Sequence, residues 1–486
     1  MNRLTGRGLL ETIDWKLVIC YIILILIGWV NIYASIHSSE PSSIFDPSCR
    51  SGKQFIWIVT SLGLASLILF VLNPRIYESL SVPIYAFTII LLVAVIFLGV
   101  EVKGSRSWFS FGPVSFQPAE LSKIATSLML ATVMSQSGFR MSNMKHFLAT
   151  AAIILVPMAI IVAQSETGSA LVYVGFVFML YREGLSGWLL FMIGMAILLF
   201  ILTLTVSSYA SILVLAFVIT LCNALYSDKV KQWMMTFLPA LVILGALPFI
   251  YNRITGDNPD PESILAKIKP IYILGAAATV AVPYFAFRAF RTGSSFRWLS
   301  IASFLIGIGL IFSVDFLFHD VLQDHQRKRI EVLLGLKDDP TGVGYNVNQS
   351  MIAIGSGGFF GKGFLKGTQT TYGFVPEQST DFIFCTIGEE WGFVGAAAVI
   401  FLYVFLIWRI IADAEQCREA FTRIYGYCVA GCIFMHLFIN IGMTVGLMPV
   451  IGIPLPFISY GGSSLWAFTV LLFIFIALVR NERKYF

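Results

Sequence analysis

Charged residues are scarce in this sequence. Only 12% of its 486 residues are Asp, Glu, Lys or Arg, while 57% are hydrophobic, and the mean hydropathy is +0.84. Soluble domains typically carry about 25% charged residues. This composition therefore excludes an ordinary soluble protein. The net charge of +5 is small, and basic residues in loops explain it without a nucleic-acid partner.

Several familiar sequence patterns are also missing. The seven cysteines are odd in number and show no disulfide or zinc spacing, and none of the five histidines has a second ligand at a metal spacing. HExxH, GxSxG and GxxxxGK[ST] do not occur. No organic cofactor is expected, and no internal repeat or soluble domain is visible. Carboxylates and basic side chains remain as the candidates for chemistry.

Long apolar runs are abundant. Each is near twenty residues, which is enough for a helix to cross a bilayer core of about 30 Å. The sequence predicts an all-α, polytopic integral membrane bundle with about 14 transmembrane helices, in one membrane domain over residues 1–486. The start, MNRLTGRGLL, lacks the pattern of a cleavable signal, so the first run is expected to span. The expected spans are 17–36, 54–72, 82–100, 118–136, 146–163, 168–182, 187–206, 208–226, 232–251, 271–289, 297–317, 379–408, 422–448 and 463–480.

Basic residues in the loops predict the orientation. With both termini in the cytoplasm, about 18 Lys and Arg residues lie inside and about 7 lie in the short outside loops, as the positive-inside rule requires. The expected outer loops are 37–53, 101–117, 252–270, 318–378 and 449–462.

The outer segment 318–378 is unusually long for a connection. Its stretch GYNVNQSMIAIGSGGFFGKGF is apolar and rich in glycine, unlike a solvated tail. We expect a partly re-entrant loop that is folded against the bundle and sheltered from lipid. A solvent-exposed linker is the alternative.

Polar residues gather at the outer ends of the expected helices. In KGSRSWFSFGPVSFQPAELSK, Arg106, Trp108 and Gln117 precede or begin a helix, and Glu120 and Lys123 share one face of it. An ionisable pair inside a span indicates a functional site, although it can also simply stabilise the helix end. We predict that these five residues bind substrate.

Other candidate substrate-binding residues lie further along the chain. Arg327 and Arg329, in DHQRKRI, can grip a phosphate or anchor the helix at the membrane interface. The remaining candidates are Gln349, Ser350, Lys362 and Gln369 in the glycine-rich stretch, and Ser459 in the broken segment LPFISYGGSS. Together with a carboxylate at the outer mouth of a helix, such groups suit a lipid-anchored, phosphorylated substrate. Asp381 in GFVPEQSTDFIFCTIGEEWG supplies that carboxylate.

Four stretches resemble the signatures of the shape, elongation, division and sporulation (SEDS) family of integral-membrane peptidoglycan glycosyltransferases. They are FQPAELSKIA, GYNVNQSMIAIGSGGFFGKGFLKGTQ, GFVPEQSTDFIFCTIGEEWGFVG and MPVIGIPLPFISYGGSS, in the family's order. The similarity covers roughly residues 15–180 and 318–480. The GKG-x-x-x-GTQ run is similar to the elongation branch, which serves cell shape, rather than to the division branch.

The resemblance implies an activity and a site. The activity is polymerisation of lipid II into glycan strands at the outer face of the bacterial cytoplasmic membrane. Asp381 matches the family's essential acid, acting as a general base or as a ligand to a divalent cation (Mg or Mn). A class B penicillin-binding protein transpeptidase is the implied partner. Glu389 and Glu390 lie about 12 Å further along the helix, where we favour a structural pairing role.

Two features depart from the family pattern. Its members usually have about ten spans, so the surplus between residues 187 and 317 is interpreted as an atypical insertion. QSETGSA, at 164–170, replaces the usual QPDLGTA-like run, so any role carried over to Glu166 is in doubt. Two alternatives remain: a lipid II flippase or transporter, and a scaffold without activity. Clustering of the polar groups on the outer side favours the polymerase.

Overall fold

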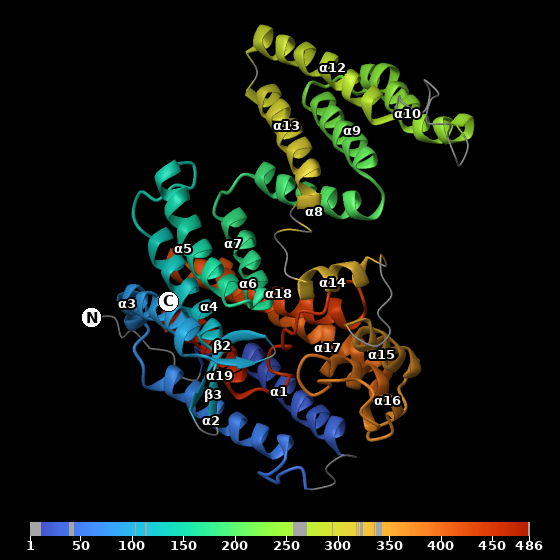
Figure 1. Ribbon diagram of the computed structural model, residues 1–486. Coiled ribbons are helices and arrows are strands. Elements are labelled where there is room, and N and C mark those ends of the chain that lie inside the picture. The colour runs from blue at the N-terminus through green and yellow to red at the C-terminus, as the bar shows by residue number, and fades with distance from the viewer. Residues whose placement is uncertain are drawn as a thin grey trace. The chain divides into compact units, whose positions relative to one another are not determined.

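The protein is largely helical. The computed structural model describes residues 11–37, 43–102, 104–111, 114–255, 270–293, 295–316, 318, 320, 324–334, 336 and 343–484. These residues form two compact units, one made of residues 1–185 with 338–486 and the other of residues 186–337. Figure 1 shows the helices of each unit by their labels.

The first unit contains the N-terminal and C-terminal helices. Its helices are α1 Trp15–Ile36, α2 Arg50–Phe70, α3 Arg75–Leu98, α4 Pro118–Met134, α5 Met144–Ala163, α6 Thr167–Val172, η1 Tyr173–Gly175, α7 Phe176–Arg182, α15 Val343–Ser356, α16 Thr368–Thr371, α17 Ile383–Gln416, α18 Ala420–Thr444 and α19 Gly462–Lys484. The second unit holds α8 Gly187–Thr205, α9 Ser208–Tyr226, α10 Val230–Thr255, α12 Pro270–Thr292, α13 Ser295–Phe316 and α14 Asp324–Leu333.

Twelve of the helices in the described part of the chain are long and apolar enough to cross a membrane. All fourteen expected spans coincide with helices, which confirms the prediction of an all-α membrane bundle. Two of the fourteen fall short of full spanning length. α4 has 17 residues, and the run from Thr167 to Arg182 is divided into α6, η1 and α7.

One expected loop instead contains strands. β1 Val100–Val102, β2 Ser105–Phe111 and β3 Val114–Phe116 form an antiparallel sheet in the order β1-β2-β3. Gly104, with a φ of 84°, sits between β1 and β2, where a left-handed residue suits a tight turn. From the sequence, 101–117 was expected to be an outer loop between two helices, and these strands were not predicted. The stretch does alternate polar residues with valine and aromatic residues, the pattern of a strand.

The core of the first unit lies around α18 and α19. Most of each helix is buried inside the protein, whereas α2, α3 and α5 each keep a largely exposed apolar face. In a bilayer an exposed apolar face contacts lipid, whereas polar side chains such as His436 and Asn440 of α18 belong in the interior. The arrangement therefore places α18 against α4, α17 and α7, with the lipid-facing helices around them.

α17 is broken at Gly392, whose φ of 64° and ψ of −160° are not helical. The break exposes backbone groups that pair with the glycine-rich stretch: Lys362 N donates to Glu389 O (3.0 Å) and Phe393 N donates to Gly358 O (2.9 Å). A Cβ on Gly361 would lie 2.1 Å from Glu390 O, so only glycine fits this approach. The stretch is thus packed against α17, not extended as a linker.

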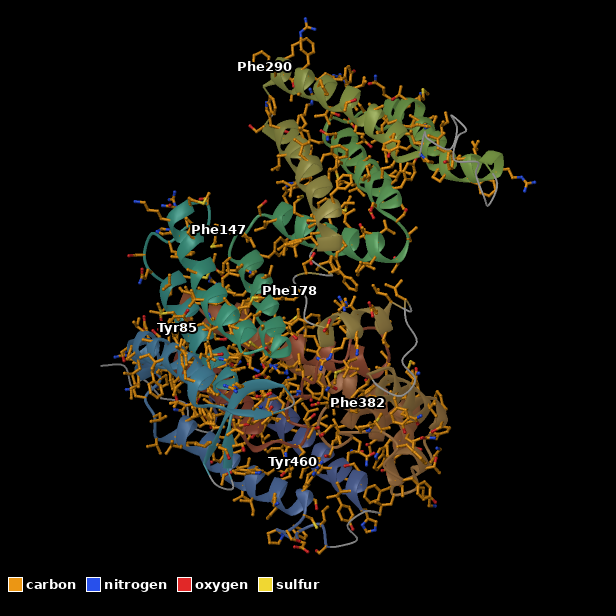
Figure 2. The ribbon with its side chains drawn as sticks, viewed as in Figure 1. Tyr85, Phe147, Phe178, Phe290, Phe382 and Tyr460 are labelled. Carbon is orange, nitrogen blue, oxygen red and sulfur yellow. The ribbon has the colours of Figure 1, made fainter. Side chains whose placement is uncertain are left out.

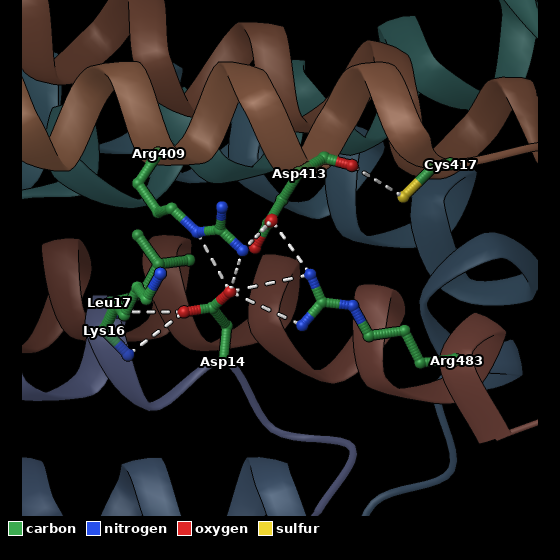
Figure 3. Close-up of polar contacts among 7 residues, drawn as sticks. All are labelled: Asp14, Lys16, Leu17, Arg409, Asp413, Cys417 and Arg483. Carbon is green, nitrogen blue, oxygen red and sulfur yellow. Dashed lines mark hydrogen bonds and ion pairs between the residues drawn. The ribbon is translucent and has the colours of Figure 1, made fainter.

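An ionic cluster joins three helix ends in the first unit (Figure 3). Asp14 caps α1, accepting from Lys16 N (3.0 Å), and pairs with Arg409 of α17 and with Arg483 of α19 (3.4 Å). Asp413 accepts from Arg483 Nη2 and Arg409 Nη2, both at 2.8 Å. Burial alone would raise the pKa of Asp14, but the hydrogen bond and charge of Arg409, with the charge of Arg483, hold it below its ordinary value.

We expect Asp14→Asn to lower the thermal unfolding temperature of the purified protein. Asn retains the helix cap but loses charge-assisted bonds that are each worth about 1.5–3 kcal/mol. Because the folded-state pKa is depressed, this contribution is present above the ordinary aspartate pKa of 3.8 and is lost as the pH falls through the lower folded value. The unfolding temperature of Asp14→Asn should therefore lie well below that of wild type at pH 7, and the two temperatures should approach each other in strong acid. Glu78→Gln, which alters an exposed acid on α3, should leave the unfolding temperature nearly unchanged. Equal shifts for both variants would contradict the assignment.

Candidate functional site

Asp381 lies in the turn that leads into α17. Its backbone N donates to Glu377 O (3.1 Å), and its carbonyl accepts from the side chain of Asn440 in α18 (2.8 Å). Its carboxylate faces the segment before α19: a Cβ on Gly452, whose φ is +77°, would lie 3.3 Å from Asp381 Oδ2. The carboxylate is therefore only partly buried, and bare backbone lies beside it.

Glu120 and Lys123 form a buried ion pair in the first turns of α4. Lys123 Nζ lies 2.8 Å from Glu120 Oε1, and the Lys123 side chain is 2% exposed. The same ammonium lies 2.8 Å from His436 Nε2 of α18. Since Lys123 donates there, the His436 Nε2 is the acceptor and Nδ1 carries the hydrogen that points to Pro454 O at 3.0 Å. The sequence grouped Glu120 with Lys123 but missed His436.

Asn440 connects this pair to Asp381. It lies one helical turn beyond His436 on α18, and its Nδ2 donates both to Asp381 O and to Ile453 O (2.7 Å). One face of α18 therefore holds Lys123, the carbonyls of residues 453 and 454, and the turn that carries Asp381. The spacing of a histidine and an asparagine four apart in an apolar helix was the signal that could have found them.

Glu166 supplies another carboxylate close to this cluster. It accepts from Ser169 Oγ (2.7 Å) and from Gln117 Nε2, the residue that precedes α4. Burial raises the pKa of Glu166, although Ser107 and Ser169 oppose the shift. A Cβ on Gly168 would lie 2.8 Å from the Ile451 side chain, so α6 packs against the segment that faces Asp381. The altered QSETGSA run thus still brings its acid to the site.

A basic residue that was not predicted from the sequence contacts the turn that carries Asp381. Arg50, the first residue of α2, donates from Nη1 to Ser379 Oγ (2.7 Å), and its guanidinium lies 5.9 Å from the Tyr460 ring centre. Ser459, a predicted site residue, donates to Thr380 O (2.6 Å). These bonds fasten the Pro- and Gly-broken segment to residues 379–381. In the sequence, only its position in the expected outer loop 37–53 could have marked Arg50 as a candidate site residue.

Other predicted residues lie away from this group. Arg106 is 60% exposed on β2 and pairs with Glu101 (3.6 Å), while Trp108 pairs across the sheet with Val100. Ser350 is buried and donates to Thr444 O (2.9 Å), and Gln349 is partly exposed beside it on α15. These contacts do not join the four residues to Asp381.

The two predicted arginines of the long segment belong to the second unit. Arg327 pairs with Asp324 (2.8 Å) within α14, and Arg329 stands on the same short helix. Their proposed share in one cavity with Asp381 therefore stays a prediction.

Lys362 and Gln369 instead gather around Glu389. The carboxylate of Glu389, fully buried, accepts from Thr368 N (2.7 Å), Gln369 N (2.9 Å) and Thr370 N (2.9 Å), and Lys362 Nζ lies 2.7 Å away. The acid thus caps α16 and closes the glycine-rich loop. This is the structural pairing role that the sequence favoured, and it assigns no substrate contact to Lys362 or Gln369.

Replacing Glu389 with Gln should mainly lower stability and yield. The amide group would turn a donor toward backbone N–H groups, so at least one buried donor would lose its acceptor, at about 1–3 kcal/mol. Glu390→Gln is a matched control, because the adjacent acid is equally buried but only the Leu365 backbone faces its carboxylate, outside good hydrogen-bond geometry. Thermal unfolding followed by size-exclusion chromatography would compare them. A larger loss for Glu390→Gln would contradict the capping role.

The site offers few protein ligands to a cation. No group of three or more His, Cys, Asp or Glu side chains placed to hold a metal ion is found among the residues described. Asp381 is the partly exposed acid, and Mg²⁺ is commonly held by one or two carboxylates together with substrate phosphates and water. The donor set thus fits a cation that arrives with a pyrophosphate, and Asp381 would hold it.

Comparisons with known proteins agree with the geometry. A sequence model of the cell cycle proteins FtsW, RodA and SpoVE matches residues 14–247 and 273–484. The peptidoglycan glycosyltransferase RodA of Treponema pallidum is 31% identical over 93% of this chain and 94% of its own length. The peptidoglycan glycosyltransferase MrdB of Escherichia coli K12 is 31% identical over 81% of this chain and 75% of its own.

Solved structures share the fold. One from work on the coordination of polymerisation and crosslinking by a peptidoglycan synthase complex is 24% identical, with a TM-score of 0.58, over 97% of this chain and 98% of that chain. The rod shape determining protein RodA of Thermus thermophilus is 21% identical, with a TM-score of 0.54, over 97% of each chain. With the signature stretches gathered around Asp381 and the match running through nearly all of the sequence, the chain belongs to the FtsW/RodA/SpoVE (SEDS) family of multi-pass membrane proteins.

Proposed function

We propose that this protein is a peptidoglycan glycosyltransferase that polymerises lipid II into glycan strands at the outer face of the bacterial cytoplasmic membrane, during cell elongation. The observation that carries the proposal is the setting of Asp381. Its carboxylate is partly exposed beside Gly452, Asn440 donates to its backbone carbonyl, and Arg50 donates to Ser379 two residues earlier. Buried Lys123 is linked to the same turn through His436 and Asn440 of α18. Groups from distant stretches of sequence thus hold the turn that carries one acid.

In this proposal Asp381 accepts the proton of the acceptor sugar's 4-hydroxyl, either as a free base or while holding a divalent cation. The oxygen then forms a bond to the anomeric carbon of the donor. The bond from that carbon to the pyrophosphate breaks, and undecaprenyl pyrophosphate leaves with the electron pair. Direct displacement inverts the α-linked donor. The turn at 379–381, held in place by its hydrogen bonds, would orient the acceptor's 4-hydroxyl toward the donor's anomeric carbon.

The positive groups near the turn support binding of a pyrophosphate. Arg50 is a guanidinium at the expected outer surface, and such a group binds phosphate oxygens bidentately. Lys123 is buried and neutralised by Glu120, so its contribution is to position α18 and Asp381 from within. Arg106 and Arg327 or Arg329 remain proposed contacts of the pyrophosphate.

We also propose a partner and an orientation. The synthase complex among the similar structures combines polymerisation with crosslinking, which supports a class B penicillin-binding protein transpeptidase as the partner here. Both termini would lie in the cytoplasm, because this orientation leaves the basic loops inside.

The experiment is polymerisation of purified lipid II by the purified protein, with and without a co-expressed transpeptidase. Glycan strands resolved by electrophoresis are the expected product, in greater amount with the partner. A flippase would instead move labelled lipid II across vesicles without lengthening it. That outcome, with no polymer under any condition, would reject the proposal.

A further inference from the structure

The second unit contains a groove that the glycosyltransferase reaction does not use. It is formed by α9, α12 and α13 and encloses a cavity volume of about 100 Å³, enough for a segment of one chain-like molecule rather than for a whole drug-sized ligand. Its lining residues are Ala216, Ile219, Thr220, Asn223, Ala281, Val282, Phe285, Arg297, Ser300, Ile301 and Phe304. Most of these side chains are apolar, and one is a cation.

The groove has an apolar end and a polar end. α9 leads toward the basic loop SDKVKQ, and α13 leads away from the basic stretch RAFRTGSSFR, so the two helices run in opposite directions. Asn223 and Arg297 therefore mark one end. Ala216 and Phe304 lie seven residues away on their helices, or about 10 Å deeper. By the distribution of basic loops, the polar end is the cytoplasmic one.

The polar side chains other than Arg297 are already bonded within their own helices. Asn223 Nδ2 donates to Ile219 O (3.0 Å), Ser300 Oγ to Phe296 O (2.9 Å), and Thr220 Oγ1 to Ala216 O (2.7 Å). They therefore require no ligand. What distinguishes this end is its charge.

Arg297 is held at the mouth by neutral acceptors. Its Nη1 donates to Thr292 Oγ1 (2.7 Å) and reaches Arg288 O at 3.4 Å. Within the described ranges no carboxylate pairs with Arg297, nor with Arg288 or Arg291 close by on α12. Those two instead lie over the rings of Tyr284 and Phe287, about 6 Å from the ring centres. Three guanidiniums thus stand at or near one end of an apolar groove, and none of them is ion-paired within the part of the chain that the structure describes.

The surroundings of the groove are those of a lipid-facing surface. α12 is among the least buried of the spanning helices, and Phe287 and Phe290 are mostly exposed along it. Phe290 projects from the end of the helix (Figure 2). Aromatic side chains at the level of the headgroups are typical of the interface. A molecule in this groove would therefore come from the membrane.

We propose that this groove binds an anionic phospholipid. The phosphate of the headgroup would contact Arg297, with Arg288 and Arg291 supplying further positive charge, and one acyl chain would lie between α9, α12 and α13. Basic pockets between spanning helices on the cytoplasmic side bind anionic headgroups by this chemistry. A zwitterionic lipid has the same chains but no net negative charge, so it would bind more weakly.

The test is native mass spectrometry of the full-length protein, purified in detergent and titrated with phosphatidylglycerol or with phosphatidylcholine of the same chains. The wild-type protein should retain more phosphatidylglycerol than phosphatidylcholine. Arg297→Gln should weaken that binding by about tenfold or more, as expected for loss of a charge-assisted contact. It should weaken phosphatidylcholine less, because the choline cation of that lipid offsets the charge of its phosphate. Ala281→Leu, which fills the groove, should weaken both lipids.

Arg140→Gln is the matched control, because Arg140 is an exposed arginine in another expected cytoplasmic loop. It should bind both lipids as wild type does. Equal retention of phosphatidylglycerol by wild type and Arg297→Gln would overturn the proposal. So would displacement by water-soluble glycerol phosphate at equal concentration, which would mean that the groove does not hold an acyl chain. Thermal unfolding with each lipid gives a second readout: phosphatidylglycerol should stabilise wild type more than Arg297→Gln.

Discussion

Asp381→Asn should fold and insert normally yet polymerise lipid II at under about 1% of the wild-type rate. Asparagine keeps the size of the side chain but neither accepts a proton nor holds a cation. General-base participation is typically worth 10²–10⁴ in rate. The carbonyl of residue 381 would still accept from Asn440, since that bond involves only the backbone. Initial rates of glycan formation, normalised to folded protein, would measure the loss.

Folding of Asp381→Asn must be established independently, for example by its elution profile and thermal unfolding beside wild type. A carboxylate that served only to cap α17 would be replaceable by Asn at a cost of about 1 kcal/mol at most. Near-normal polymerisation by the folded variant would therefore place the catalytic acid elsewhere, and Glu166 would be the next to test. Asp381→Glu should restore activity in part, limited by its extra methylene.

Lys123→Met should have the second-largest effect, on both stability and activity. It removes the positive partner of Glu120 in the interior of the bundle, and breaking a buried pair in this way typically costs about 3–5 kcal/mol. It also removes the donor to His436, the residue one turn from Asn440. Polymerisation should fall about ten- to a hundredfold. Lys145→Met, which alters an exposed lysine, should change neither quantity.

The double variant Glu120→Gln with Lys123→Met separates the two effects. Removing both charges leaves no unpaired ion, so much of the stability should return. Activity should stay at least about tenfold low, because His436 then keeps its bond to Pro454 O but loses the Lys123 donor that ties α4 to the face of α18 holding the Asp381 turn. If the double variant instead polymerised lipid II as wild type does, the pair would serve stability alone.

The helices were predictable because their signal is strong and local. In a membrane, an apolar run of about twenty residues satisfies its backbone hydrogen bonds most simply as a helix. All fourteen runs are helical in the structure. The strands over 100–116 were missed because they are three short segments in the connection between two spans. Only the alternation of polar with valine and aromatic residues distinguishes them from a loop. Asp381 and the Glu120–Lys123 pair could be found from charge in an apolar setting.

The rest of the site depended on packing between distant segments. His436, Asn440 and Arg50 are separated from the partners named here by dozens to hundreds of residues, and their local signals, a spacing of four in an apolar helix and a place in an outer loop, do not say which partners they meet. Arg106 illustrates the converse. As a conspicuous base in an outer segment it was a reasonable candidate, but its strand turns it toward Glu101 and solvent. Sequence indicates which groups are costly to bury; only the fold decides which of them meet.

The break in α17 also sets an order of events during synthesis. The glycine-rich stretch forms backbone bonds with residues 389–393, which the ribosome adds about 30 residues later, or roughly 2–6 s at ordinary elongation rates. Until then its peptide groups have no partners in α17, and such groups are not stable in lipid. Residues 357–363 must therefore wait in an aqueous or sheltered place until α17 has inserted. Asp381 precedes that helix by only two residues, so the loop and the turn at 379–381 become ordered in the same step.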